Sequence, residues 1–316
     1  MGPATIGLDV GGTKILGVVL DGDGVVLVEQ RVPTPRMGDA LIAALALLVD
    51  DLRRATAGTA SVTAVGGGLL GLVDRGGVWR FAPNLPGIVE LPVGPILAAE
   101  TGLPVALDND ATCALRAEHT LGAARDAHDA VLLTFGTGIG AGMVVDGSIV
   151  RGANGFAGEA GHMVVEVDGV PCPCGRRGCW ERYASGTFLG RRGREEADAG
   201  HADAILVLAD GDPFAVRGEH VTAAARAGDA VGRRLVQEMA EWVAIGLVNL
   251  VQLLDTRRFV LGGGVAEAAD VILEPVRGAF DRRAVSPDHR PGVEIVVAEL
   301  GEQAGAIGAA LLARNP

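Results

Sequence analysis

The sequence predicts an α/β fold divided into two domains, and three observations support this prediction. The chain has 316 residues, more than one compact core usually holds, and a cleft between two domains commonly binds a small ligand. Candidate strands alternate with candidate helices along the chain, which is typical of α/β proteins. A pattern of strand, glycine turn, strand and Asp-Gly occurs twice, over residues 5–22 and 130–147.

The repeated pattern reads TIGLDVGGTKILGVVLDG in the first copy and AVLLTFGTGIGAGMVVDG in the second. Aligned without gaps, Gly11 matches Gly136 and Gly17 matches Gly142. Chance similarity between glycine-rich hairpins is one explanation, because the chain contains 48 glycines. The other is a duplicated β-β-β start of two similar domains, whose glycine turns offer backbone N–H groups to a polyphosphate. Neither turn has the spacing of a Walker loop or a dinucleotide fingerprint.

The remaining elements follow from periodicity and from turn residues. Apolar residues at helical spacing, Pro and Gly at helix ends, and short apolar runs indicate them. The predicted helices are residues 39–56, 95–103, 235–254 and about 302–313, and the predicted strands begin at Val62, Pro104, Arg257 and Val293. Residues 191–234 show no clear strand, so we expect a helical insertion there.

Composition and charge exclude several classes of function. Hydrophobic residues make up 49% of the chain and charged residues 21%, as in a globular protein. The formal net charge of −12 argues against binding of nucleic acid through a basic surface. The chain starts without a signal-peptide pattern, and no apolar run approaches the roughly 18 residues of a membrane span. We therefore expect a cytoplasmic protein with no nucleic acid or membrane partner.

Four residues with metal-binding side chains lie close together in the sequence: His162, Cys172, Cys174 and Cys179. Three thiolates and one imidazole make a closed four-coordinate shell that is typical of structural zinc. A disulfide is the alternative, but the cytoplasm is reducing, and Cys172 and Cys174 are too close in the chain to pair comfortably. The spacing therefore predicts a zinc ion that orders a loop. Cys113 stands apart, and we expect it in the core.

Three polar residues, Asp108, Asn109 and Asp110, directly follow the strand predicted over residues 104–107 and precede a helical segment. Open α/β sheets bind ligands at the carboxyl ends of their strands, so these side chains lie where catalysis is expected. A carboxylate held against a hydroxyl group can act as a general base. Capping of the next helix is the competing interpretation, and one of the three can well do that.

Several motifs together resemble the ROK family of sugar kinases and repressors, and particularly its bacterial glucokinases. The motifs are LDVGGTK, LDNDA, FGTGIGAG, GEAGH, CPCGRRGCWE and LGGGV, and they cover essentially the entire chain. The resemblance implies the actin-like, hexokinase-type (ribonuclease H-like) fold, in which two α/β domains close over a central cleft. We expect a small domain at residues 1–108 with 301–316 and a large domain at 109–300, which carries the zinc loop and the helical insertion.

The resemblance also implies an activity, the ATP-dependent phosphorylation of glucose at its 6-hydroxyl. Asp110 would be the base that removes the hydroxyl proton. The implied hexose ligands are Asn84, Asn109, Asp110, Glu159, His162 and Glu181. Mg²⁺ and ATP would be held by two phosphate loops and a glycine run beside the adenosine. These residues are Asp9 (close to Mg²⁺), Gly11, Gly12, Thr13, Lys14, Thr137, Gly138, Gly262, Gly263 and Gly264.

Simpler explanations stay open for single residues. Asn84 lies between two prolines and can be a turn residue, and Glu159 can pair with an arginine. Arg176 and Arg177 are most simply solvated surface charges. Because members of the family are commonly dimers or tetramers, we expect a homodimer or homotetramer.

Three other functions compete with the glucokinase. A kinase for N-acetylmannosamine, N-acetylglucosamine or fructose would show nearly the same residues. A non-enzymatic sugar-sensing regulator of the same family would carry a DNA-binding segment ahead of the motif at Asp9, for which the sequence leaves no room. Polyphosphate is a less expected donor than ATP, because relatives of that kind generally lack the zinc loop. The sequence therefore predicts an ATP-dependent glucokinase.

Overall fold

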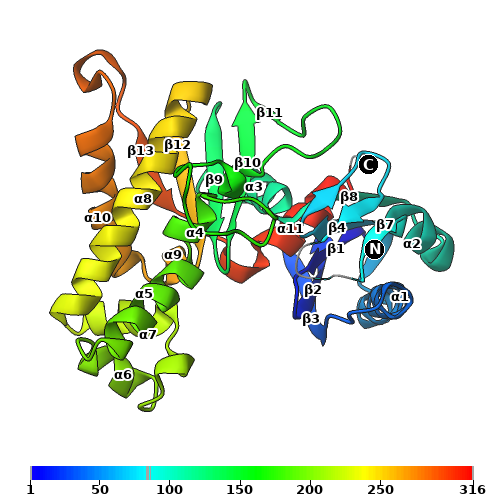
Figure 1. The fold of residues 1–316 in the computed structure, drawn as a ribbon. Coiled ribbons are helices and arrows are strands. Elements are labelled where there is room, and N and C mark those ends of the chain that lie inside the picture. The colour runs from blue at the N-terminus through cyan, green and yellow to red at the C-terminus, as the bar shows by residue number, and fades with distance from the viewer. Residues whose placement is uncertain (1, 83–84, 86, 315–316) are drawn as a thin grey trace. The chain divides into compact units, whose positions relative to one another are not determined.

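The computed structural model describes residues 2–82, 85 and 87–314, and the chain divides into two compact units (Figure 1). Unit 1 comprises Met1–His128, Gly142–Gly158 and Glu299–Pro316, and unit 2 comprises Asp129–Ala141 and Glu159–Ala298. Each unit contains both strands and helices, as the sequence predicted. The domain boundaries expected from the sequence, 1–108 with 301–316 and 109–300, stay a prediction.

Unit 1 is built on a five-stranded sheet with the strand order β3-β2-β1-β4-β8. Its strands are β1 (Gly2–Val10), β2 (Lys14–Asp21), β3 (Val26–Pro33), β4 (Ala60–Leu69) and β8 (Val105–Asn109). Strands β1, β2 and β3 form an antiparallel meander, whereas β1, β4 and β8 run parallel. In the parallel register Asp9 lies opposite Gly68, and Gly68 lies opposite Asp108. The polar residues at the ends of β1 and β8 therefore share one edge of the sheet.

Helices cover both faces of this sheet because side chains alternate along each strand. One face of β1 joins an apolar core with helices α1 (Gly38–Ala55) and α2 (Val93–Thr101). Its residues in that core are Ala4, Ile6, Leu8 and Val10. The other face carries helix α11 (Ala304–Leu312), where the hydroxyl of Thr5 donates to the carbonyl of Ala310 at 2.8 Å. Asp9 belongs to this second face.

Helix α3 (Asp110–Leu121) begins directly at the end of β8 and packs against α11. Cys113 of α3 is fully buried and forms a small apolar cluster with Ala309 and Leu312. Its position in the core confirms the sequence prediction for this cysteine.

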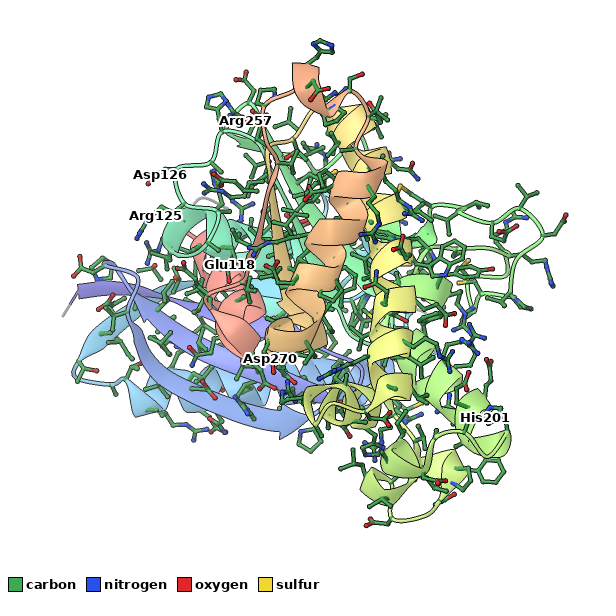
Figure 2. The ribbon with its side chains drawn as sticks, turned by 90° about the vertical axis from the view of Figure 1, so that its left-hand side faces the viewer. Glu118, Arg125, Asp126, His201, Arg257 and Asp270 are labelled. Carbon is green, nitrogen blue, oxygen red and sulfur yellow. The ribbon has the colours of Figure 1, made fainter. Side chains whose placement is uncertain are left out.

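A buried carboxylate ties the end of α3 to the chain that leads into α11. Glu118 has no exposed surface, and Figure 2 labels it beside α11. Its side chain accepts hydrogen bonds from the backbone N–H groups of Ala123 (2.8 Å), Glu299 (3.2 Å) and Leu300 (2.8 Å). A single side chain thus satisfies donors from two segments that are far apart in the sequence.

A three-stranded antiparallel sheet that the sequence did not predict also belongs to unit 1. Its strands are β5 (Leu72–Val73), β6 (Trp79–Phe81) and β7 (Val89–Leu91). Strands of two or three residues are too short to show an alternating pattern. Trp79 anchors the sheet, because it is fully buried and its indole N–H donates to the carbonyl of Leu70 at 2.8 Å.

Unit 2 contains three parallel strands, with β12 between β9 and β13. They are β9 (Ala130–Phe135), β12 (Arg258–Gly263) and β13 (Glu294–Val297). The strand beside β9, β10 (Ile139–Val145), continues into unit 1 and pairs there with β11 (Ser148–Ile149). The repeated sequence pattern therefore forms β1-β2-β3 in one copy and β9-β10-β11 in the other, which confirms the duplicated β-β-β start.

The other helices lie in unit 2, and the longest is α8. They are α4 (Glu181–Ala184), α5 (Gly186–Asp198), α6 (Asp203–Leu208), α7 (Gly218–Arg226), α8 (Ala230–Leu254), α9 (Gly264–Glu267) and α10 (Ala269–Arg283). Short 3₁₀ turns span Ala160–His162, Pro213–Ala215 and Pro287–His289, and in unit 1 Gly301–Gln303. Helices α5 to α7 confirm the helical insertion. Helix α10 was not predicted, and Pro275 inside it is a residue that usually ends a helix.

Among the residues that the structure describes, none of the helices combines the length and the apolar character needed to cross a membrane.

Replacing Glu118 by Ala should lower the free energy of unfolding by at least about 3 kcal/mol, because three backbone N–H groups lose an acceptor. Glu118→Gln keeps one oxygen acceptor and should lie between Glu118→Ala and the unchanged protein. Urea denaturation followed by circular dichroism measures both. Glu100→Ala, at an exposed position of α2, is the matched control and should change stability by less than about 0.5 kcal/mol. Equal stability of Glu118→Ala and the unchanged protein would contradict this role.

Candidate functional site

Two carboxylates, Asp9 and Asp110, stand at the carboxyl ends of the parallel strands β1 and β8 in unit 1, with β4 between these strands. Asp9 faces α11, and a Cβ atom added at Gly305 of that helix would lie 2.7 Å from the Cγ atom of Asp9. Only glycine permits this close approach. It places the Asp9 carboxylate against the N-terminal turn of α11, where the helix dipole favours a negative charge.

The protein environment makes both carboxylates unusual acids. Burial and, to a smaller extent, the charge on Asp110 raise the pKa of Asp9 to about 7, while Lys14 opposes them. Burial also raises the pKa of Asp110, although a hydrogen bond from the backbone N–H of Ala111 at 2.8 Å opposes the change. Two nearby carboxyl groups whose pKa values are both raised favour the binding of a cation or of a proton. Asp9 can therefore hold a divalent cation, and Asp110 can accept a proton.

Of the three polar residues at the end of β8, Asn109 is the helix cap. Its Oδ1 accepts hydrogen bonds from two backbone N–H groups in the first turn of α3, at 2.9 and 3.2 Å, and its Nδ2 donates to the carbonyl of Gly71 at 3.2 Å. Asp108 is only 1% exposed. Asp110 alone among them keeps a half-buried carboxylate. The accessible acid is therefore the one predicted to be the base, and Asn109 retains one amide hydrogen for a ligand.

The predicted first phosphate loop is the turn between β1 and β2, directly after Asp9. The backbone N–H of Gly11 donates to the carbonyl of Lys14 at 3.0 Å, which closes the turn. Gly12 is half-buried, whereas Thr13 and Lys14 are exposed. The ammonium group of Lys14 lies 3.1 Å from Glu302, just before α11. The structure thus brings the loop, Asp9 and the start of α11 together in one unit.

Unit 2 contains a cavity of about 530 Å³, a size that suits a small organic ligand. Two of the predicted nucleotide residues, Thr137 and Gly264, line it. Gly262 and Gly263, at the end of β12, directly precede the lining residue Gly264. Gly263 has a positive φ of 68°, which is accessible to glycine.

Helices of the insertion supply a large part of this cavity wall, and the sequence did not assign these residues. They include Arg194, Arg217, Gly218, Glu219, Thr222 and Arg226. A helix of mixed polar and small residues carries no local motif, so only its packing reveals that it lines a cavity. The N-terminal residue of α5, Gly186, also belongs to the wall.

The second glycine turn is held to the start of α5. The hydroxyl of Thr187 donates to the carbonyl of Thr137 at 2.7 Å, and the N–H of Gly186 donates to the carbonyl of Gly136 at 3.0 Å. A Cβ atom at Gly138 would lie 2.2 Å from the carboxylate of Glu181. The turn therefore contacts both the cavity and one of the predicted hexose ligands.

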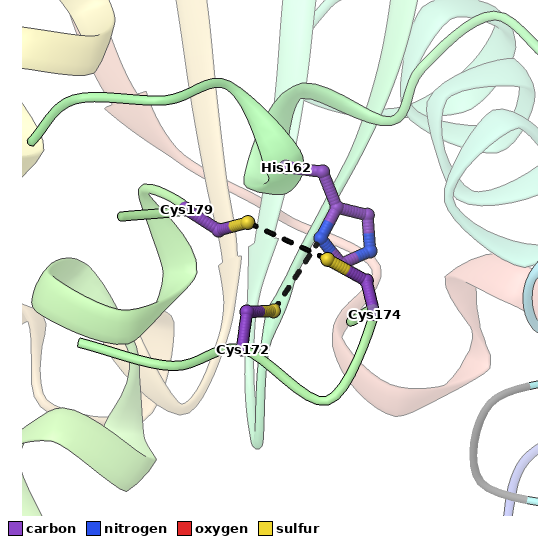
Figure 3. A group of neighbouring side chains, drawn as sticks. All are labelled: His162, Cys172, Cys174 and Cys179. Carbon is purple, nitrogen blue, oxygen red and sulfur yellow. Dashed lines mark hydrogen bonds between the residues drawn. The ribbon is translucent and has the colours of Figure 1, made fainter. Parts of the chain in front are cut away.

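The four metal-binding side chains predicted from the sequence come together in unit 2, as Figure 3 shows. Their ligand atoms all lie within 4.8 Å of one another. The Sγ atoms of Cys174 and Cys179 are 3.6 Å apart, and the Sγ of Cys172 lies 3.8 Å from the Nδ1 of His162. A tetrahedral zinc ion requires neighbouring ligand atoms about 3.6–3.8 Å apart, given Zn–S bonds of about 2.3 Å and slightly shorter Zn–N bonds. The cluster fits this metal, and all four cysteines of the chain are free thiols.

Aromatic residues fix the metal-binding loop to helix α8. Trp180, next to Cys179, is fully buried, and its indole N–H donates to the carbonyl of Trp242 at 2.7 Å. A Cβ atom at Gly246 of α8 would lie 2.1 Å from its ring. The hydroxyl of Tyr183 accepts a hydrogen bond from the backbone N–H of Val170 at 2.7 Å. The loop is therefore held from both ends.

Two predicted hexose ligands, Glu159 and Glu181, flank the imidazole of a third, His162. The Nε2 of His162 lies 3.7 Å from Glu159, and its Nδ1 lies 3.9 Å from Glu181. Because Nδ1 faces the thiol of Cys172, this nitrogen is the one that could hold a metal ion together with the three thiols. The remaining predicted hexose ligand, Asn84, lies outside the described residues.

Comparison with known proteins places this arrangement in a family. The chain is 38% identical over 315 residues to a glucokinase of Streptomyces coelicolor, which covers 99% of this chain and 98% of that protein. It is 34% identical over 316 residues to an N-acetylmannosamine kinase of Citrobacter koseri, with 99% of each chain covered.

Solved structures give the same result. A ROK family glucokinase from Streptomyces griseus in complex with glucose and AMPPNP is similar with a TM-score of 0.89 and 37% identity, covering 99% of this chain and 100% of that one. A ROK hexokinase from Thermus thermophilus has a TM-score of 0.78 and 36% identity, with 98% of each chain covered. These similarities confirm the predicted actin-like, hexokinase-type fold.

The family model described as "ROK family" matches residues 5–315, from the first strand to the end of the last helix. The two glycine turns, the acidic pair and the Cys₃His loop described above all lie within that range. The chain therefore belongs to the ROK family.

Proposed function

We propose that the protein is an ATP-dependent glucokinase, which transfers the γ-phosphoryl group of ATP to the 6-hydroxyl of glucose. The observation that carries this proposal is the acidic pair Asp9 and Asp110, which combines a carboxylate suited to a cation with a partly accessible, poorly ionised base. Glucokinases are among the relatives that match the chain over almost its full length. One solved relative was crystallised with glucose and an ATP analogue.

Asp110 acts as the general base in this proposal. Its half-buried carboxylate takes the proton from the sugar hydroxyl as the oxygen attacks the phosphorus atom. The raised pKa of Asp110 makes it a stronger base than an ordinary surface aspartate, provided that it is ionised at the working pH. A hydrogen bond to the N–H of Ala111 orients one of its oxygens and leaves the other for the substrate.

The nucleotide is held by backbone donors and by Asp9. Phosphoryl transfer needs positioning and charge neutralisation more than covalent chemistry, so glycine turns and one metal-binding carboxylate suffice. Asp9 would hold the Mg²⁺ that accompanies ATP and that neutralises phosphate charge. Gly11, Gly12, Thr13 and Lys14 would contact phosphate oxygens.

The second phosphate turn and the adenosine site are assigned to unit 2. Thr137 and Gly138 would bind phosphate oxygens, and Gly262 to Gly264 would border the adenosine in the cavity of about 530 Å³. The hydrogen bonds that tie this turn to α5 support the assignment, because they hold it in place before the ligand arrives.

The hexose is recognised by polar side chains. Glu159, His162 and Glu181 would accept or donate hydrogen bonds to hydroxyls near the anomeric carbon, while Asn109 and Asp110 would bind those next to the reacting one, with Asn84 completing the set. Such a site rejects sugars that lack a hydroxyl, because buried groups then stay unpaired. Zinc on the Cys₃His cluster would fix the ring of His162, so that its Nε2 faces the sugar.

A kinase for another hexose is the second candidate, and the 34% identity to an N-acetylmannosamine kinase favours it. A coupled assay with Mg²⁺-ATP and a panel of glucose, fructose, mannose, N-acetylglucosamine and N-acetylmannosamine decides between the two. The proposal requires glucose to have the highest kcat/KM. A preference of more than tenfold for an N-acylated sugar would replace it with the second candidate, and activity with none of the sugars would refute both.

The location and assembly are also proposals. Four free thiols are typical of a reducing compartment, which supports the cytoplasm. A homodimer or homotetramer stays a prediction that sedimentation analysis can test.

Asp110→Asn should lower kcat by about 10²–10⁴-fold, because the amide cannot accept the hydroxyl proton. Glucose binding, measured by isothermal titration calorimetry, should change by less than about fivefold, since the amide has a similar size and keeps its hydrogen bonds. Normal turnover of this variant would remove Asp110 as the base.

Cys174→Ala should lose bound zinc and raise the KM for glucose, because the ring of His162 is no longer fixed. Elemental analysis of the purified protein measures the zinc content, with about one ion per chain expected before the change. Cys113→Ala is the matched control: this cysteine is buried in the core of unit 1, so its replacement should keep the zinc. Unchanged zinc content in Cys174→Ala would contradict the ligand assignment.

Asp9→Asn should abolish Mg²⁺-dependent activity and yet stabilise the ligand-free protein above neutral pH. The pKa of Asp9 is about 7 in the folded protein and near the ordinary aspartate value of 3.8 when the chain is unfolded, so the folded protein keeps a proton on it between these pH values. Stability therefore decreases as the pH rises from about 4 to 7, and the variant escapes this loss. Differential scanning calorimetry should give a Tm that is a few degrees higher at pH 8 but not at pH 4.

The exposed residue Asp39 provides the control, because Asp39→Asn makes the same chemical change on the surface of α1. It should leave the Tm within about one degree at both pH values. A lower Tm of Asp9→Asn at pH 8 would contradict the electrostatic account of this site.

A further inference from the structure

A buried ion pair lies directly behind the proposed base and has no part in the chemistry described so far. Asp108, two residues before Asp110, is 1% exposed, and its Oδ2 lies 2.9 Å from the Nε of Arg151. The same guanidinium donates through Nη2 to the carbonyl of Leu107 at 3.0 Å. Arg116 of α3 is more distant, at 3.9 Å from Oδ2. Arg151 thus contacts two consecutive residues at the end of β8.

The chain around Arg151 is itself firmly held in unit 1. Arg151 follows β11, and the next residue, Gly152, accepts a hydrogen bond from the guanidinium of Arg75 at 2.6 Å. Gly155 has a positive φ of 96°, and a Cβ atom there would lie 2.8 Å from the carbonyl oxygen of Val73. Because this segment is anchored, Arg151 can act as a fixed support for the strand end.

We propose that Arg151 is a positioning residue for the reaction: through Asp108 and the carbonyl of Leu107 it fixes the end of β8 from which Asp110 projects. The inference rests on the proposed function, because it assigns Arg151 to the base of that reaction. The carboxylate of Asp108 also accepts a hydrogen bond from the backbone N–H of Asn109 at 3.0 Å, so the support reaches the residue next to Asp110. A displacement of about 1 Å at a reacting group can cost about a hundredfold in rate.

Arg151 has a second effect, on charge. The charged or titratable groups around Asp110 are Asp9 on β1, Lys14 on β2, Asp108 on β8, Cys113 and Arg116 on α3, and Arg151 after β11. Burial raises the pKa of Asp108, and the charges of Arg151 and Arg116 oppose this rise. Without Arg151 the Asp108 carboxyl would take up a proton more readily, so the anion that Arg151 now holds at the end of β8 would be lost.

Kinetics of Arg151→Met with glucose and Mg²⁺-ATP test the inference. We expect kcat to fall by about 10- to 100-fold while the KM for glucose changes by less than threefold. A merely structural role would lower the melting temperature without this split between kcat and KM. An unchanged kcat would overturn the proposal.

Two further variants separate position from charge and carry the test if Arg151→Met does not fold. Arg151→Lys keeps the charge but contacts only one acceptor at a time, so kcat should fall by less than in Arg151→Met. Arg151→Met combined with Asp108→Asn leaves no unpaired charge, and kcat should stay at least fivefold reduced because the support of the strand end is still missing. Full recovery of kcat in this double variant would contradict the positioning role.

Arg54→Met is the control, because it removes an exposed arginine of unit 1 that pairs with Asp51 of its own helix α1, at 2.6 Å. Its kcat should stay within about twofold of the unchanged protein. Absence of hexose phosphorylation by the unchanged protein would refute the proposed function itself. Phosphorylation by the unchanged protein together with a fully active Arg151→Met would refute only the positioning inference.

Discussion

The parallel register of β1, β4 and β8 is the constraint on which the acidic site depends. It sets Asp9, Gly68 and Asp108 side by side on three neighbouring strands, and Asp110 follows as the first residue of α3. Because the residue on the middle strand is glycine, no side chain separates the two acidic strand ends. The close approach of like charges then follows from the sheet itself, and it adds to burial, the larger cause, in raising the pKa of Asp9.

Neighbouring groups stabilise this pair of acidic side chains, whose close approach is unfavourable. The N-terminal turn of α11 lies against Asp9, and Asn109 accepts from two N–H groups in the first turn of α3, so that this turn occupies only one oxygen of Asp110. Asp108 is neutralised by Arg151. Of the acids at this edge, Asp9 and Asp110 therefore remain for ligands. Sites that bind cations or move protons commonly hold such strained charges, and the rest of the fold supplies the stability.

In unit 2 the metal-binding loop is held in place by its own contacts before any substrate binds. Two pairs of its metal-binding atoms already lie at the distances that a tetrahedral ion requires, and Trp180 and Tyr183 attach the loop to α8. The carboxylate of Glu181 contacts the glycine turn at Gly138 on one side and the thiol of Cys172 on the other. Glu181 thus connects the metal-binding loop to the glycine turn within unit 2.

The sequence by itself determined the α/β class, the duplicated β-β-β start, most of the helices and the four members of the metal cluster, because each leaves a local pattern of periodicity, glycine spacing or ligand type. Tertiary structure decided which of Asp108, Asn109 and Asp110 caps a helix, pairs with an arginine or stays accessible, since adjacent residues of one type differ only in the partners that folding brings to them. It also decided that helices of the insertion line the cavity of unit 2, and that α10 forms in spite of Pro275. Those outcomes depend on contacts between segments that are distant in the sequence, such as the contact of Asp108 with Arg151. Local sequence patterns do not reveal such contacts.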